Sequence, residues 1–204
     1  MATIAPRYKP NLSAEELHGL LKPFQIDRGE HPVVVVGLRG YYKDIMGAPG
    51  VNDRGIYDDA IFIDSPSITA SFNANTDPSK YRKGHGFDEG KKGMASLKPG
   101  YWPVYKFDKH KKKYLALCQR GRVTVIRDGD PPYEDTGEGF GINIHKGGLT
   151  STSSEGCQTI HPDQWKAFIE TVIDQAKRYH QKEGETWEHL KDRLVIPYIL
   201  IDVT

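Results

Sequence analysis

The sequence predicts an α+β fold that is mainly β, with peripheral helices at both ends of the chain. Short β-branched and aromatic runs, separated by turn residues, occupy most of the region from residue 33 to residue 144. Helical periodicity appears only near the two ends, and no repeat or linker divides the sequence. We therefore expect residues 1–204 to form a single domain, in which residues 1–30 are a helical appendage to the body formed by residues 31–204.

The elements follow in order along the chain. A helix is expected within residues 11–24, because Ser13 and Glu16 form a capping-box pattern. Two more helices are expected near the C-terminal end, an amphipathic one over 162–181 and a shorter one over 186–193. The expected strands cover residues 33–36, 56–63, 68–72, 101–108, 114–118, 123–126, 139–144 and 195–203. Pro197 indicates an edge position for the last strand, and the glycine- and lysine-rich residues 78–98 predict a long loop.

Composition limits the classes of function. The chain is 37% hydrophobic and 27% charged with a net charge of +1, which is typical of a soluble globular protein and gives no general attraction to nucleic acid or acidic membranes. No run of about 18 apolar residues occurs, so we expect no membrane insertion. We also expect a monomer. The N-terminus lacks the apolar core of a secretory signal, which predicts synthesis in the cytoplasm. Four lysines around His110 are interpreted as a solvated hairpin tip, or alternatively as a contact for an anionic polymer: Lys109, Lys111, Lys112 and Lys113.

The chain has two cysteines, which do not suggest a disulfide scaffold. Cys118 ends an apolar run and is expected in the core. Cys157 follows a polar loop, twelve positions after His145, which is expected at the end of a strand. Because a cysteine nucleophile needs an imidazole to generate its thiolate, these two residues are the candidate nucleophile and base.

The loop between them has the residues that acyl transfer requires. Gly156 allows a sharp turn before the cysteine and exposes backbone N–H groups that can hold an oxyanion. Ser153 and Ser154 add small hydroxyl groups that can bind a peptide carbonyl or orient the loop.

This arrangement resembles the active-site motif of the L,D-transpeptidases, the YkuD-type domains. The matching residues are His145-x-Gly147, the polar loop, and Ser154-x-Gly156-Cys157. The order, histidine before cysteine, differs from that of papain-like and NlpC-type peptidases, and the arginine that sortases carry shortly after the cysteine is missing. The segment 97–101 is similar to a strand-opening segment of the same family.

The resemblance implies a β-sandwich or partly open barrel of the L,D-transpeptidase type, with residues 31–204 as the catalytic domain. Cys157 would attack a carbonyl of a peptidoglycan stem peptide to form a thioester, and His145 would be the base, oriented by a backbone carbonyl near the loop glycines. No metal or other cofactor is implied. Residues expected near the substrate are Lys146, Gly147, Thr150 and His85.

Three departures from the family pattern leave hydrolysis and transpeptidation both open. Glu155 stands in place of the family's second histidine, Gln158-Thr159 follow the cysteine, and the loop is short. Short loops of this kind resemble compact relatives among phage and secreted antibacterial proteins. We therefore expect a phage lysis enzyme or an antibacterial effector that acts on the cell wall after release or delivery.

Two alternatives remain at this point. The chain could be a non-catalytic wall-binding or virion structural protein that keeps the fold. It could also be a zinc-dependent peptidoglycan peptidase that uses His85, Asp88 and His145, although this spacing matches no zinc motif and leaves Cys157 without a role.

Overall fold

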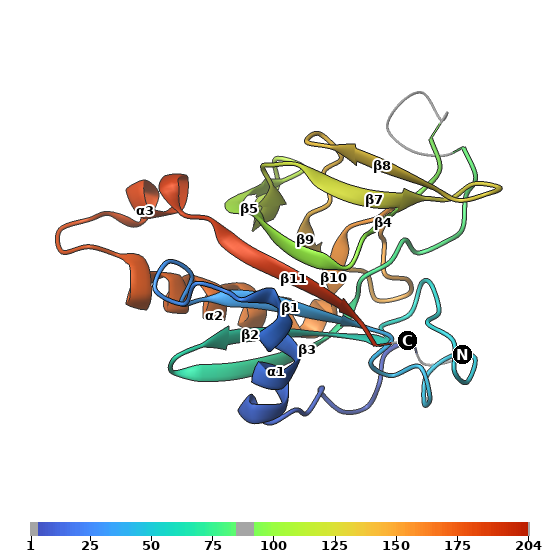
Figure 1. Ribbon diagram of the computed structural model, residues 1–204, viewed down its shortest axis with the longest axis horizontal. Coiled ribbons are helices and arrows are strands. Elements are labelled where there is room, and N and C mark those ends of the chain that lie inside the picture. The colour runs from blue at the N-terminus through green and yellow to red at the C-terminus, as the bar shows by residue number, and fades with distance from the viewer. Residues whose placement is uncertain (1–3, 85–91, 204) are drawn as a thin grey trace.

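An eight-stranded closed barrel with a small second sheet forms the body of the molecule in the computed structural model, which describes residues 4–84 and 92–203 (Figure 1). In their order around the wall, the barrel strands are β1 (Val34–Arg39), β11 (Ile196–Asp202), β5 (Gly100–His110), β6 (Tyr114–Gln119), β9 (Ile144–Lys146), β10 (Gln158–Ile160), β3 (Ile68–Asn75) and β2 (Asp59–Ser65). The second sheet has the order β4 (Ala95–Leu97), β7 (Val123–Arg127) and β8 (Tyr133–Gly137). The mainly β architecture is confirmed, and the wall is closed where a sandwich or a partly open barrel was expected.

The helices lie near both ends of the chain, as the sequence predicts. They are α1 (Ala14–Leu21), which continues into the short 3-10 helix η1 (Lys22–Phe24), α2 (Pro162–His180) and α3 (Trp187–Arg193). The capping box of α1 is formed in full, because Ser13 Oγ accepts from the N–H of Glu16 at 3.1 Å and the Glu16 carboxylate accepts from the N–H of Ser13 at 2.7 Å. Among the described residues, no helix is both long and apolar enough to cross a membrane.

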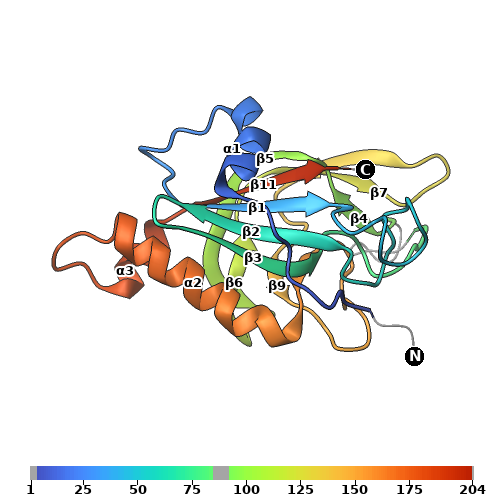
Figure 2. The ribbon, with the colours of Figure 1, turned by 90° about the horizontal axis from the view of Figure 1, so that it is seen from below.

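Strand β1 separates two apolar clusters because its side chains alternate between the two faces of the wall. Val33 and Val35 belong to the main core, together with Phe168 of α2. Val34 and Val36 belong to a second cluster that includes Leu17 of α1. The two helices therefore cover opposite faces of the β1–β2–β3 part of the wall (Figure 2).

The expected edge position of the last strand is wrong. Strand β11 lies between β1, with which it pairs in parallel, and β5, with which it pairs antiparallel. Pro197 is accommodated because the register with β5 shifts between Ile196 and Tyr198, so its missing N–H falls at an irregularity of the ladder.

Further differences concern short elements. The predicted loop 78–98 contains β4, which pairs with β7, and strands β8 and β10 were not predicted. In place of the strand predicted over 139–144, the structure has β9, which covers only Ile144–Lys146 and therefore contains His145. His85 and Asp88 lie outside the described residues.

Candidate active site

A cavity of about 300 Å³ lies between the tip of the β5–β6 hairpin, strand β7 and the start of β10. It brings together four of the residues that the sequence singled out: His145, Ser153, Gly156 and Cys157. The other residues that line it are Ala95, His110, Lys111, Arg127, Phe140, Gly141, Ile142, Asn143 and Glu155. The strands that surround it, β5, β7 and β9, are visible together in Figure 1.

The pairing of β9 and β10 explains how residues twelve positions apart meet. The two strands run in parallel, with Thr159 opposite His145, and the N–H of Gln158 donates to the carbonyl of Asn143 at 2.9 Å. Continuing this register backwards places Cys157 beside Asn143, two residues before His145. Since side chains alternate along a strand, Cys157 and His145 are on the same face and reach the same cavity.

His145 has a defined tautomer. Its Nδ1 lies 2.8 Å from the carbonyl oxygen of Lys146, and because a carbonyl can only accept, Nδ1 carries the proton. The lone pair of neutral His145 is therefore on Nε2, as a general base requires. Burial lowers the pKa of His145 to about 4, and the neighbouring His110 ring adds to this lowering. His145, the candidate base, is therefore neutral at physiological pH.

Cys157 is held as a thiol. Its S–H donates to the carbonyl of Gly141 at 3.1 Å, and its sulfur accepts from the N–H of Asn143 at 3.4 Å. Burial raises the pKa of the Cys157 thiol to about 11, although the N–H of Asn143 favours the thiolate. The side chain is half-buried, and within residues 4–84 and 92–203 no hydrogen bond joins it to His145. The resting pair is thus a neutral thiol and a neutral imidazole.

Ser154 builds the turn that presents the cysteine. Its hydroxyl donates to the carbonyl of Cys157 at 2.7 Å and accepts from the N–H of Gly156 at 3.0 Å. Its backbone N–H donates to Ser79 Oγ, and its carbonyl accepts from the N–H of Ser79 at 2.8 Å. Because Ser154 occupies the N–H of Gly156, that group is not free for an oxyanion. The N–H of Cys157 has no acceptor among the described residues, and it remains the candidate oxyanion donor.

Of the other residues that the sequence predicts near the substrate, only some line the cavity. Ser153 lines the cavity and has a φ of 57°. Lys146, Gly147 and Thr150 do not line it. The Lys146 ammonium lies 5.8 Å from the centre of the Tyr114 ring, Thr150 is exposed, and Gly147 is buried. Their contact with a substrate stays a prediction.

Sequence reasoning missed several lining residues, above all His110 and Asn143. The His110 ring stacks on His145, with 4.0 Å between the ring centres and 18° between the planes. Alternation along β5 places His110 on the same side as Lys106 and Asp108, which are partly or fully exposed, so no hydrophobic pattern marked it as buried. Its position among four lysines also favoured a solvated tip, which is correct for Lys111 to Lys113 but not for His110, which is only 6% exposed.

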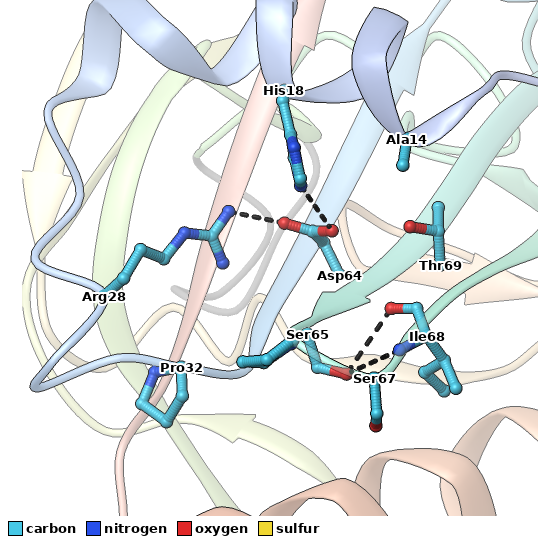
Figure 3. Close-up of a pocket in the computed structure, with 10 residues that line it drawn as sticks. Ala14, His18, Arg28, Pro32, Asp64, Ser65, Ser67, Ile68 and Thr69 are labelled. Atoms are coloured by element: carbon cyan, nitrogen blue, oxygen red, sulfur yellow. Dashed lines mark hydrogen bonds and ion pairs between the residues drawn. The ribbon is translucent and has the colours of Figure 1, made fainter.

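A second hollow, of about 380 Å³, lies between α1 and the turn that joins β2 to β3 (Figure 3). The Asp64 carboxylate points to its centre, where it contacts His18 at 3.2 Å and also Arg28. These contacts connect the N-terminal appendage to the barrel. The described lining of this hollow has no cysteine, and its histidine, His18, bonds to the Asp64 carboxylate and not to a lining hydroxyl, so the chemistry favours the smaller cavity.

Metal ligands do not gather in the part of the chain that the structure describes, because no group of three or more His, Cys, Asp or Glu side chains there could hold an ion. Cys118 is 1% exposed and free, and its expected place in the core is confirmed.

Comparison of the chain with family models, with curated proteins and with solved structures finds no match.

Proposed function

We propose that this protein is a cysteine-dependent enzyme of the L,D-transpeptidase type that cleaves or exchanges peptide bonds in peptidoglycan stem peptides. One observation carries the proposal. Parallel pairing of β9 and β10 directs His145 and Cys157 into one cavity, and the carbonyl of Lys146 orients the imidazole with Nε2 unprotonated. An orienting backbone carbonyl just before the loop glycines is also what the sequence resemblance implies.

The first half of the reaction forms a thioester. Binding of the stem peptide displaces the Cys157 S–H from the carbonyl of Gly141, and its proton passes to His145 Nε2. The thiolate sulfur attacks the peptide carbonyl carbon, and the resulting oxyanion accepts a hydrogen bond from the N–H of Cys157. The carbon–nitrogen bond then breaks, and His145 returns the proton to the leaving amine.

The second half regenerates the enzyme. Water, or the amine of a second stem peptide, attacks the thioester carbonyl and gives a proton to His145. The carbon–sulfur bond breaks, and the proton returns to Cys157. Water as acceptor gives hydrolysis, and an amine gives a cross-link.

The charges of the cavity support an anionic peptide as substrate. Lys111, Arg127 and Glu155 line it, and since Arg127 also pairs with Asp135 at 3.1 Å, Lys111 is the lining cation on which the attraction for an anionic group rests. Stem peptides carry free carboxylates that such a lining attracts. The short loop between His145 and Cys157 resembles that of compact phage and secreted antibacterial relatives, which supports a phage lysis enzyme or an antibacterial effector that reaches the wall after release or delivery. We also expect the protein to act as a monomer.

The test is incubation with purified peptidoglycan sacculi, followed by mass spectrometry of the muropeptides. We expect new or cleaved peptide links with the wild type and with Cys118→Ala, and none with Cys157→Ala. A chelator should leave the activity unchanged, and the product masses distinguish hydrolysis from transfer. Untouched sacculi with every variant would contradict the proposal and favour a non-catalytic wall-binding protein, whereas loss of activity on chelation would favour a metal-dependent peptidase.

A further inference from the structure

The stacked histidine pair joins parts of the barrel that are not neighbours in the sheet. His110 ends β5 and His145 lies in β9, and β6 stands between these two strands in the wall. Both rings are nearly fully buried, with 6% exposure for His110 and 5% for His145. The contact is therefore formed away from solvent, at the edge of the cavity that holds Cys157.

A chain of hydrogen bonds fixes the orientation of His110. The backbone N–H of Gln119 donates to Asn143 Oδ1 at 2.9 Å, which leaves the Asn143 amide nitrogen pointing to His110 Nδ1 at 3.1 Å. Because that nitrogen can only donate, His110 Nδ1 is the acceptor and the proton of the neutral ring is on Nε2. The two stacked rings thus hold opposite tautomers.

The same glutamine also holds the segment that leads into β9. Its side-chain oxygen accepts from the N–H of Ile142 at 2.9 Å, and its amide nitrogen donates to the carbonyls of Gly121 at 2.8 Å and Glu138 at 3.1 Å. Gln119, Asn143 and His110 therefore form a connected support for the wall of the cavity, in which Gln119 and His110 are buried and Asn143 is partly buried.

We propose that His110 is a positioning residue for His145, which fixes the plane of the base through the stack and, only when it is itself protonated, opposes a positive charge on His145. The inference rests on the proposed role of His145 as the base that activates Cys157.

Opposition to protonation follows from the distance between the rings. Two imidazolium ions with their centres 4.0 Å apart repel each other, and the low exposure of both residues reduces the screening by water. Burial and Lys111 lower the pKa of His110, so this ring is also neutral at physiological pH. The titratable and charged groups that line the same cavity as His145 are His110, Lys111, Arg127, Glu155 and Cys157, with Tyr114 next to His110. Trp165 of α2, which is uncharged, contacts Tyr114.

The test measures the protonation of His145 directly, by side-chain ¹⁵N NMR of the full chain across a pH series. In the wild type we expect the proton of neutral His145 on Nδ1 and that of neutral His110 on Nε2. The variant His110→Phe keeps a flat ring in the stack but removes the titrating nitrogens. Its His145 pKa should rise, because the cationic form no longer meets a second imidazolium. His189→Phe is the matched control, because the His189 side chain is 73% exposed on α3, and it should leave the His145 titration unchanged.

Activity gives the second readout. His110→Ala removes the stack, and we expect kcat to fall about 10²-fold with little change in KM, because a misplaced base slows the chemical step. His110→Phe should keep most of kcat at the optimum, while the acid limb of kcat/KM moves to higher pH. The inference is overturned if His145 titrates identically in the wild type and in His110→Phe, or if folded His110→Ala keeps full kcat. Because the NMR readout needs no substrate, inert sacculi with an altered His145 titration would contradict the proposed function and not the coupling between the two rings.

Discussion

At the scale of single residues, the structure holds the proposed nucleophile in its protonated form. Cys157 donates to a carbonyl, and His145 is neutral with a free Nε2. This state differs from a preformed thiolate–imidazolium pair, in which the thiol pKa is strongly lowered. Iodoacetamide reacts with the thiolate only, so it distinguishes the two states.

We expect the rate of Cys157 alkylation in the ligand-free protein to rise about tenfold per pH unit between pH 7 and pH 9, because burial raises the pKa of this thiol to about 11. Mass spectrometry of tryptic peptides gives the rate for each cysteine. Cys118→Ala should leave the Cys157 rate unchanged. A fast rate that does not vary over this range would show a preformed ion pair instead.

Ser154 is a second residue whose role can be measured. Ser154→Ala leaves the N–H of Gly156 and the carbonyl of Cys157 without their partner, so we expect unfolding to become about 1–3 kcal/mol easier by urea denaturation. Ser151→Ala is the control, because Ser151 accepts only a longer bond of 3.3 Å from Ser153. Equal stability of the two variants would mean that the Ser154 bonds do not hold the turn.

The sequence predicts that Cys157, His145 and the loop between them form one site, because they are close in the chain and have distinctive chemistry. The place of His110 and Asn143 in the cavity could not be predicted from the sequence, for a physical reason. Their contribution depends on a stack across β6 and on a bond from the backbone of Gln119. Such contacts form only in the folded barrel, so no local sequence pattern predicts them.

At the scale of elements, long apolar strands were predictable and short polar ones were not. Strands β1 and β6 follow from continuous apolar runs, and α1 and α2 from caps and periodicity. Strand β10 is only Gln158–Ile160, and it exists because β3 and β9 flank it on both sides. Position within a sheet is likewise a tertiary property, which is why the expected edge strand proved to be enclosed.

The close approach of β4 to the turn before Cys157 gives a prediction at this scale. A Cβ on Gly156 would lie 2.3 Å from the carbonyl oxygen of Ala95, and the φ of Gly156 is 149°. We therefore expect Gly156→Ala to push β4 away from the turn, to lower the free energy of unfolding by about 1–3 kcal/mol and to impair activity. Gly139→Ala is the control, because a Cβ there meets no atom within 4 Å. A Gly156→Ala variant as stable as Gly139→Ala would show that β4 yields without cost.

At the scale of the whole molecule, the buried carboxylates at the start of β2 and just after β3 should make the stability of the fold depend on pH. Asp59 is fully buried and accepts from the N–H groups of Gly40 at 2.5 Å and Thr76 at 2.6 Å. Burial raises the pKa of neighbouring Asp58 to about 7, and the charge of Asp77 adds to the rise. Arg39 pairs with Asp77 at 3.3 Å.

The direction of this pH dependence follows from comparing the pKa of Asp58 in the folded and in the unfolded chain. Asp58 has a folded pKa above its unfolded value of 3.8, so its contribution to stability is complete below about pH 4 and is lost as pH rises through 7. Asp58→Asn removes this loss while its side-chain oxygen can still accept from the N–H of Asp53. We expect the Tm of the variant to gain on that of the wild type between pH 5 and pH 8, by about 2–4 °C for each kcal/mol of the difference. A constant Tm gap over this range would contradict the raised pKa.

The central claim is that Cys157 forms a thioester with a stem peptide inside this barrel. The most direct measurement is intact-protein mass spectrometry after incubation with a soluble stem peptide and rapid acid quenching. The account predicts an added mass equal to the acyl fragment, located on the peptide that contains Cys157 and absent from Cys157→Ala. Peptide turnover without such an adduct, and undiminished in Cys157→Ala, would contradict it.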